Sequence, residues 1–263
     1  QCVITLTSGE RLSRISAQPI AEGRHPIMPL YRVSLNGVPR WYYLRTRFPF
    51  PGRITLQQPE TTRHMEAVGS SRFYLEPRSN TLFKLIADKF TAKRQPLNWW
   101  LRDILEKRLL GGFDALKEWR SNRLIRRAGL KAVACRGVGL AINPLNPLGS
   151  LLAMEYLASG ESGETHFLRL DETARLAFIR RLCDDAAVLI HHGYCHRDFH
   201  YGNVWVDAKG DIVWIDTHVK RLPRRADRRR QAIDAMLSPS KLKGDRYRRF
   251  AHGYLHERLG QPA

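Results

Sequence analysis

The sequence predicts an α+β fold in which a β-rich N-terminal half precedes a mainly helical C-terminal half. Short runs rich in β-branched and aromatic residues, separated by turn residues, dominate roughly the first 90 positions. Longer segments with apolar residues at helical spacing follow, the clearest of them at 171–192. A chain of 263 residues is long enough for two lobes with a substantial buried core.

Residues 1–58 are predicted to form a β-rich N-terminal extension. Val3–Leu6 is a short apolar run, and the runs Leu30–Leu35 and Trp41–Leu44 flank Asn36-Gly37. Asn-Gly between two β-prone runs is a strong signal for a two-residue hairpin turn. No chemically suggestive motif lies in this extension, so we expect it to be structural.

Residues 59–153 are predicted to form the first lobe, beginning with three strand-like runs at Arg63–Val68, Arg72–Glu76 and Leu82–Ala87. Gly69 and Ser70 lie between the first two runs, where a loop could cover the phosphates of a nucleotide. The sequence there is not GxGxxG, so a backbone phosphate cradle is only weakly indicated.

Lys84 lies inside the third run, between Phe83 and Leu85. A charged side chain in an apolar strand is costly to bury unless it has a partner. We expect that partner to be Glu118, on a helix predicted from Phe113 to Ala128 that stops at Gly129. The alternative is an edge-strand lysine that faces solvent.

The stretch 90–112 is basic and carries Trp99 and Trp100 beside apolar residues at helical spacing. Ordinary packing explains these tryptophans, and an aromatic anchor at a membrane interface is the alternative.

Residues 154–263 are predicted to form the second lobe. The apolar strand 151–157 loosens into Ser159-Gly160, which is typical of a hinge between two lobes. Within it we single out Met154, Glu155 and Leu157, because backbone groups of Glu155 and Leu157 could bind the adenine of a nucleotide.

A helix predicted at 171–192, ending at Gly193, leads into the chain's most informative segment. That segment contains His196-Arg197-Asp198, then Asn203, a short hairpin, and Asp216 at the end of an apolar run. Asp198-x4-Asn203, followed by a strand pair and an acid, matches the catalytic loop and metal-binding acid of kinase-like folds. The sequence thus predicts a bilobal protein-kinase-like fold with Asp198 as catalytic base.

The same pattern predicts the cofactors. Phosphoryl transfer from ATP depends mainly on positioning and on neutralising charge. Asn203 and Asp216 are predicted to hold Mg²⁺, while Lys84 and Glu118 would position the phosphates of ATP.

The chain has 44 Lys and Arg against 25 Asp and Glu, a formal charge of +19, which favours an anionic partner. A cluster of arginines shortly after Asp216 is predicted to dock anionic substrate or lipid, with a solvated helix face as the alternative. The docking residues are Arg221, Arg224, Arg225, Arg228 and Arg229, with Arg230 beside them.

Taken together, residues 60–255 resemble the lipopolysaccharide core sugar kinases, which phosphorylate heptose in the inner core. The resemblance is carried by Lys84, the helix with Glu118-Trp119, and three segments: Met154-Glu155-Tyr156-Leu157, Asp198-Phe199-His200-Tyr201-Gly202-Asn203, and Ile215 to Arg221. The sequence is most similar to the branch that acts on the second heptose. This resemblance implies ATP as donor and a sugar hydroxyl as acceptor, an alcohol-group phosphotransferase. It also implies work on the core oligosaccharide or lipid-linked core, at the cytoplasmic face and anionic surface of the inner membrane.

The sequence departs from protein kinases in three places. His200 stands where Ser/Thr kinases commonly carry lysine, Thr217-His218 follows Asp216 in place of Phe-Gly, and no Ala-Pro-Glu follows. Too few residues remain after Asp216 for a peptide-binding platform. A sugar or other small hydroxyl compound is therefore favoured over a protein acceptor.

Other interpretations stay open. A protein kinase or another small-molecule kinase would share the motif, although a cationic aminoglycoside fits poorly with the positive charge. An inactive kinase-like binding module would not need all five motif residues. A zinc cluster of His192, Cys195, His196 and His200 has irregular spacing, so His196 is interpreted as bracing the loop. Nucleic-acid binding lacks an interleaved aromatic motif and is not expected.

The sequence has no apolar run long enough to cross a membrane and no recognisable signal peptide. Its four cysteines are scattered, which favours a reducing compartment, and Cys183 is predicted to lie in the core. Nothing in the sequence predicts an oligomeric state.

Overall fold

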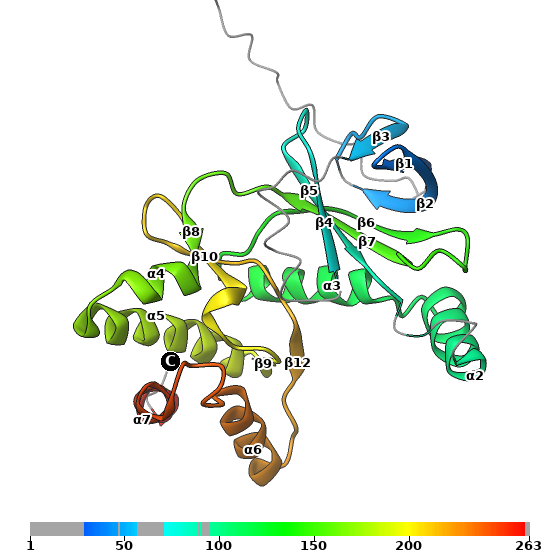
Figure 1. Ribbon diagram of the computed structural model, residues 1–263. Coiled ribbons are helices and arrows are strands. Elements are labelled where there is room, and N and C mark those ends of the chain that lie inside the picture. The colour runs from blue at the N-terminus through cyan, green and yellow to red at the C-terminus, as the bar shows by residue number, and fades with distance from the viewer. Residues whose placement is uncertain (1–28, 47, 57–70, 89, 91–94, 261–263) are drawn as a thin grey trace, which may run out of the picture.

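The computed structural model describes residues 29–46, 48–56, 71–88, 90 and 95–260. It has a mixed α+β architecture in which a sheet built from the N-terminal half precedes a C-terminal part made mainly of helices (Figure 1). The predicted α+β class is therefore confirmed. One helix, α3 (Asp114–Arg127), lies between the sheet and the C-terminal helices.

Seven strands form the N-terminal sheet in the order β3-β1-β2-β6-β7-β5-β4. All neighbours pair antiparallel except β1 and β3, which are parallel. The strands are β1 (Leu30–Leu35), β2 (Val38–Thr46), β3 (Arg53–Leu56), β4 (Ser71–Glu76), β5 (Thr81–Ile86), β6 (Cys135–Ala141) and β7 (Ser150–Glu155).

The hairpin predicted at Asn36-Gly37 is confirmed. Asn36 and Gly37 have φ values of +48° and +85°, as a tight two-residue turn between β1 and β2 requires. These strands belong to the same sheet as β4 and β5, so the predicted extension and first lobe share one sheet. Where the chain divides into domains stays a prediction. The runs Val3–Leu6 and Arg63–Val68 lie outside the described residues.

Strand β5 explains how a lysine enters the interior. It lies between β7 and β4, so the edge-strand alternative for Lys84 is wrong. Side chains alternate along a strand, and Phe83 and Leu85 join the apolar cluster on one face of the sheet. Leu82 and Ile86 join the cluster on the other face, which α3 covers through Trp119. Lys84 therefore points toward α3.

The segment before α3 is helical, as its apolar spacing predicts. Pro96 is the first residue of the short α2 (Pro96–Asn98), which continues as the π-helix η1 (Trp99–Leu109). The side chain of Trp100 is exposed, so packing in a core does not account for it. Helix α3 then begins after Phe113 and ends just before Gly129, whose φ is +85°. The predicted helix Phe113–Ala128 is thus confirmed to within one residue at each end.

The C-terminal part is built around α5 (Glu172–His191), which packs against α7 (Asp245–Gly260). Gly193 follows α5 with φ +81°, so the predicted helix and its stop are confirmed. Cys183 is fully buried in the apolar cluster of this part, as predicted. The remaining elements are β8 (Glu161–Ser162), α4 (Gly163–Arg169), β9 (Tyr194–His196), η2 (Tyr201–Asn203), β10 (Val204–Val206), β11 (Ile212–Trp214), β12 (Val219–Arg221) and α6 (Ala226–Met236).

Two small sheets hold the motif segments. β10 pairs with β11 as the predicted hairpin, and β12 pairs with β9. The segment 215–218 leaves β11 and enters β12, so it runs beside the loop that follows β9. Among the described residues, no helix is long and apolar enough to cross a membrane.

Candidate functional site

A buried ion pair joins the sheet to α3. Lys84 Nζ donates to both carboxylate oxygens of Glu118 at 2.9 Å, so the predicted partner is confirmed. Lys84 is 8% exposed and Glu118 only 1%. Burial works against the charged lysine, but the carboxylates of Glu118 and Asp216 outweigh it and raise the pKa of Lys84. The lysine is therefore a fixed positive charge.

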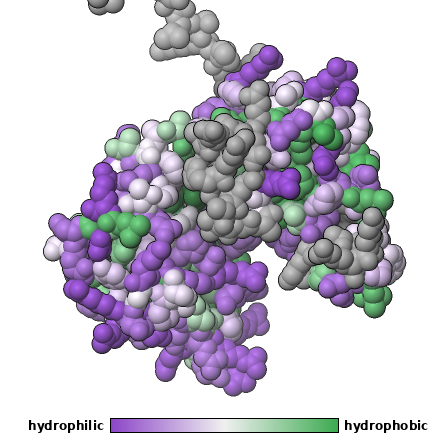
Figure 2. All heavy atoms as spheres, viewed as in Figure 1, coloured by the Kyte–Doolittle hydropathy of each residue, from purple (hydrophilic) through white to green (hydrophobic). Residues whose placement is uncertain are grey.

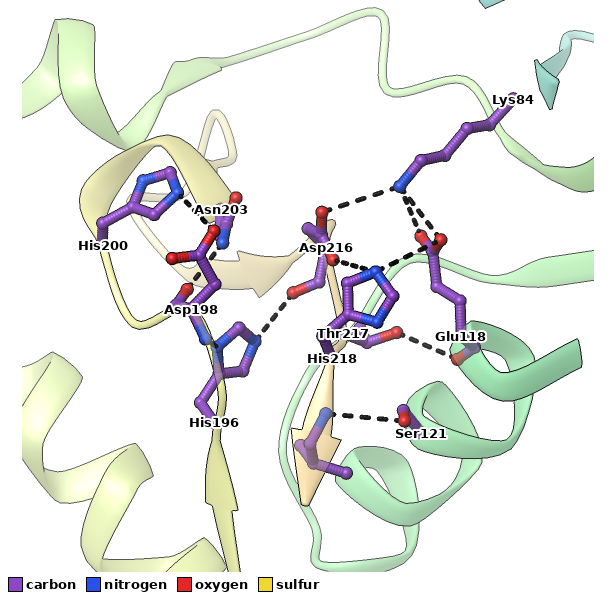
Figure 3. A network of polar contacts seen from close by, with 11 residues as sticks. Lys84, Glu118, Ser121, His196, Asp198, His200, Asn203, Asp216, Thr217 and His218 are labelled. Atoms are coloured by element: carbon purple, nitrogen blue, oxygen red, sulfur yellow. Dashed lines mark hydrogen bonds and ion pairs between the residues drawn. The ribbon is translucent and has the colours of Figure 1, made fainter. Parts of the chain in front are cut away.

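Asp216 completes this group from the C-terminal part (Figure 3). Its Oδ2 lies 3.6 Å from Lys84 Nζ. Burial acts to raise its pKa, yet the neighbouring Lys84, His218 and His196 hold that pKa below its usual value. Asp216 is thus an anion, and the sheet and the helical part meet at a lysine between two carboxylates.

Helix α3 is also tied to the chain that follows Asp216. Thr217, which is buried, donates its hydroxyl to the backbone oxygen of Glu118 at 3.2 Å. Two residues on, the Val219 N–H donates to Ser121 Oγ at 3.4 Å. These hydrogen bonds therefore hold Glu118 and Asp216 near each other, in addition to the attraction of both to Lys84.

His196 braces the loop that carries Asp198, as the sequence predicts. Its Nδ1 accepts from the Asp198 N–H at 3.2 Å, and its Nε2 lies 2.9 Å from the Asp216 backbone oxygen. Because Nδ1 is an acceptor, Nε2 carries the proton and donates. Burial lowers the pKa of His196, which suits this neutral form. One ring therefore fixes the spacing between the two acidic residues.

Asn203 sits where the loop meets the hairpin. Its Nδ2 donates to the Asp198 backbone oxygen at 2.6 Å, which sets the orientation of the amide. Its own backbone oxygen accepts from Ile215 N–H at 3.0 Å and Asp216 N–H at 3.4 Å. A backbone hydrogen bond thus joins Asn203 to Asp216, so the two residues predicted to bind metal lie side by side.

These two residues suit a hard divalent cation. Asp216 Oδ1 is buried and has no hydrogen-bond partner among the described residues, although His218 Nε2 lies 3.5 Å away. The amide of Asn203 uses its nitrogen for the loop, which leaves its oxygen as a possible ligand. A carboxylate and an amide oxygen are ligands that Mg²⁺ accepts.

Asp198 faces solvent more than the rest of the network. Its side chain is 51% exposed, and its Oδ2 lies 3.4 Å from His200 Nε2. Partial burial acts to raise its pKa, but hydrogen bonding to Lys241 and the nearby His200 lower it overall. Asp198 is therefore an accessible carboxylate, open to a reactant.

Lys241 is a site residue that the sequence reasoning missed. It comes from the segment between α6 and α7, and its Nζ lies 3.1 Å from Asp198 Oδ1 and 2.9 Å from the Arg197 backbone oxygen. The loop has His200 at the position where protein Ser/Thr kinases commonly carry a lysine, two residues after their catalytic aspartate. Lys241 places a cation beside Asp198 from a distant part of the chain.

His218 was also not singled out as a site residue. Its Nε2 lies 3.5 Å from Asp216 Oδ1 and 3.8 Å from Glu118 Oε2, so it lies against both buried acids. The only signal in the sequence was its position two residues after Asp216.

Of the predicted hinge residues, Met154 and Glu155 end β7 and Leu157 lies two residues beyond it. Met154 is buried in the cluster between the sheet and α3, while Leu157 packs against it. The Glu155 N–H already donates to the Ala134 backbone oxygen at 2.9 Å. Among the described residues, no hydrogen bond engages the Leu157 N–H. Binding of adenine by Glu155 and Leu157 stays a prediction.

The remaining predicted residues do not join the network. Gly69 and Ser70 lie outside the described residues. The docking arginines are all exposed along the end of β12 and the start of α6. Arg225 pairs with Asp227 at 3.1 Å, and Arg229 donates to the Ile190 backbone oxygen at 3.2 Å. Hydrophilic residues gather over this C-terminal part of the surface (Figure 2).

The alternative zinc cluster is not supported. His196 and His200 spend ring nitrogens on loop hydrogen bonds, and His192 bonds the Val188 backbone oxygen. Within the part of the chain that the structure describes, one other group could hold a metal, formed by Asp234, His252 and His256. The three described cysteines are free.

No protein-family model matches the chain, and no curated protein matches it. Solved structures do resemble it. WaaP in complex with acyl carrier protein has a TM-score of 0.46 at 14% identity, covering 79% of this chain and 78% of that one. The bifunctional kinase-methyltransferase WbdD gives 0.44 at 15% identity, over 89% of this chain and 50% of that one. A 2.2 Å crystal structure of WbdD gives 0.43 at 15% identity, over 89% and 49%. The protein is similar in structure to WaaP and WbdD.

Proposed function

We propose that the protein is an ATP-dependent kinase with a bilobal protein-kinase-like fold that phosphorylates a sugar hydroxyl, a heptose of the lipopolysaccharide inner core. One observation carries the proposal. Lys84, Glu118 and Asp216 form one charged group across the junction of sheet and helices, and Asn203 and Asp198 adjoin it through direct hydrogen bonds. Phosphoryl transfer needs three things that this set can provide: a cation for the phosphates, ligands for Mg²⁺, and a carboxylate that acts as base on the acceptor hydroxyl.

Lys84 is the residue proposed to grip the phosphates of ATP. Glu118 accepts two of its N–H bonds and fixes where the ammonium lies. In such folds the lysine must be paired with a helix glutamate for the site to be competent. The contacts from Thr217 and Val219 to α3 support this role, because they keep Glu118 in place.

Asn203 and Asp216 are the proposed Mg²⁺ ligands. Asn203 and Asp216 would hold the ion, which would supply positive charge to neutralise the phosphates during transfer. The unpartnered Oδ1 of Asp216 supports this assignment.

Asp198 is the proposed catalytic base. Its lowered pKa keeps it ionised at neutral pH, and its exposure lets a hydroxyl approach. It would orient the hydroxyl and take its proton as the hydroxyl oxygen bonds to the γ-phosphorus of ATP, while the bond from that phosphorus to the bridging oxygen breaks and ADP leaves. Lys241, bonded to the same carboxylate, would hold it in one orientation.

Glu155 and Leu157 are the proposed adenine contacts. A carbonyl and an N–H two residues apart face the same way on an extended chain, so the Glu155 carbonyl and the Leu157 N–H would form a donor–acceptor pair. The Leu157 N–H has no hydrogen-bond acceptor among the described residues, which supports this arrangement. Gly69 and Ser70 are proposed to lie over the phosphates.

The acceptor assignment rests on the resemblance in sequence and on charge. A phosphorylated core oligosaccharide or lipid-linked core is anionic, which suits a chain of net charge +19. The exposed arginines 221–229 are proposed to dock this acceptor or the anionic surface of the inner membrane, on its cytoplasmic face. Exposed Leu97, Trp100 and Leu110 near α2 and η1 support peripheral membrane contact.

The test is turnover with Mg²⁺ and ATP on three separate acceptors: dephosphorylated core oligosaccharide, a peptide mixture and small sugars. A mass increase of one phosphoryl group on the oligosaccharide is expected. Asp198→Asn should lower the rate by at least about 100-fold, whereas Glu257→Gln, which changes an exposed acid on α7, should not. Phosphorylated peptide beside unmodified oligosaccharide would favour a protein kinase instead.

A further inference from the structure

Two helices of the C-terminal part bring three metal-ligating side chains together, away from the network above. His252 and His256 are four residues apart on α7, so they lie one turn apart on the same face. Asp234 faces them from the last turn of α6. The three candidate ligand atoms all lie within 4.8 Å of one another.

The distances suit a shared metal ion. His252 Nε2 and His256 Nε2 lie 3.1 Å and 3.5 Å from the same oxygen, Asp234 Oδ1. With zinc–ligand bonds of about 2.0–2.2 Å, neighbouring ligands of a tetrahedral site are separated by about 3.3 Å. A zinc ion could therefore meet all three atoms with only small movements.

An independent observation points to a ligand. His256 Nε2 is buried and has no hydrogen-bond partner among the described residues, even though the ring as a whole is 36% exposed. A buried polar nitrogen without a partner calls for an explanation such as an unseen ion. His252 alone is close enough to donate to Asp234, so a simple hydrogen bond leaves His256 unused.

We propose that Asp234, His252 and His256 form a binding site for a divalent transition metal, with Zn²⁺ as the ion of choice. Imidazole nitrogens and a carboxylate are common zinc ligands, and two histidines at this helical spacing are a familiar zinc pair. All three side chains are about two-fifths exposed, so water would be available to complete the coordination of a bound ion.

The site has a structural consequence because it links α6 to α7. The segment between these helices carries Lys241, which contacts Asp198. A metal that fastens the two helices would stabilise both ends of this segment. This proposal does not depend on the identity of the reaction.

The experiment uses the full chain without a histidine tag, freed of metal by a chelator that is then removed. Zn²⁺ is titrated calorimetrically, and Co²⁺ is used as a spectroscopic probe of tetrahedral geometry. One equivalent of Zn²⁺ should bind, with a visible Co²⁺ spectrum and a higher melting temperature. His256→Ala and Asp234→Asn should each weaken the affinity at least about tenfold.

The matched control is His191→Ala, which removes an exposed histidine at the end of α5, outside the cluster. It should bind Zn²⁺ as the parent does. Circular dichroism of each variant establishes whether it is folded. If a histidine variant does not fold, the conservative Asp234→Asn variant still provides the test. Equal Zn²⁺ affinity in the parent, His256→Ala and Asp234→Asn would overturn the proposal, as would no binding by the parent.

Discussion

Replacing Lys84 by methionine removes the cation from a pair that water barely reaches. Glu118, at 1% exposure, would lose the cation that offsets the rise in its pKa caused by burial, and among the other described residues His218 Nε2 lies 3.8 Å away. Removing one partner of a buried ion pair costs about 3–5 kcal/mol, because the other charge is left without compensation. At about 2–4 °C per kcal/mol for a chain of this size, the melting temperature should fall by roughly 6–20 °C.

The cause can be isolated by a double-mutant cycle. Lys84→Met combined with Glu118→Gln removes the stranded charge, so the pair of changes should cost less than the sum of the single changes. A coupling of about 1–3 kcal/mol is expected for residues in direct contact. Thermal and urea unfolding of the four proteins measure it.

The matched control is Lys131→Met. Lys131 also pairs with a carboxylate, Asp211, but both side chains are largely exposed. Exposed pairs contribute little, so this variant should unfold almost as the parent does. If Lys131→Met were as destabilising as Lys84→Met, burial would not be what makes the Lys84 pair strong, and the reasoning would fail.

Three further changes test other parts of the molecule. Lys241→Ala removes a hydrogen bond to charged Asp198 that is worth about 1.5–3 kcal/mol. The kcat should therefore fall about 10- to 100-fold while the affinity for Mg²⁺-ATP stays unchanged, and Lys241→Arg should recover part of the rate. Lost ATP affinity at normal kcat would contradict this. Burial raises the pKa of Asp185 to about 6, although it accepts a hydrogen bond from Trp214. The folded state therefore holds this proton more tightly than the unfolded state, and Asp185 costs stability as pH rises through about 6. Asp185→Asn should stabilise the protein by up to about 3 kcal/mol at pH 8 and give no gain near pH 3, measured by urea unfolding at both; equal gains would refute this. Reversing Arg228 and Arg229 to Glu should weaken binding to anionic vesicles in a salt-sensitive way, whereas unchanged sedimentation would mean that they form only a solvated helix face.

The features predicted well from sequence were those set by local pattern. Turn chemistry and periodicity predict the hairpin at Asn36-Gly37 and the helix ends near Gly129 and Gly193. The reason is that glycine and asparagine adopt a positive φ more readily than other residues do. The Lys84–Glu118 pair was predictable although 34 positions separate its members, since a lysine in an apolar strand needs a counter-charge.

The features missed depend on packing between distant segments. Nothing near Lys241 indicates that its ammonium reaches Asp198, because the path of the chain between α6 and α7 is set by how those helices pack. The tie from Thr217 to α3 is equally non-local. The insertion of β6 and β7 between β2 and β5 was also not predicted, since strand order depends on pairings across the whole N-terminal half.

The most direct test of the proposed site is the linkage between Mg²⁺ and ATP binding, measured by calorimetry. Affinity for ATP should rise at least about tenfold when Mg²⁺ replaces chelator. Asp216→Asn should abolish that gain, while Glu257→Gln should keep it. ATP affinity that is the same with and without Mg²⁺, or a full gain in Asp216→Asn, would contradict the account.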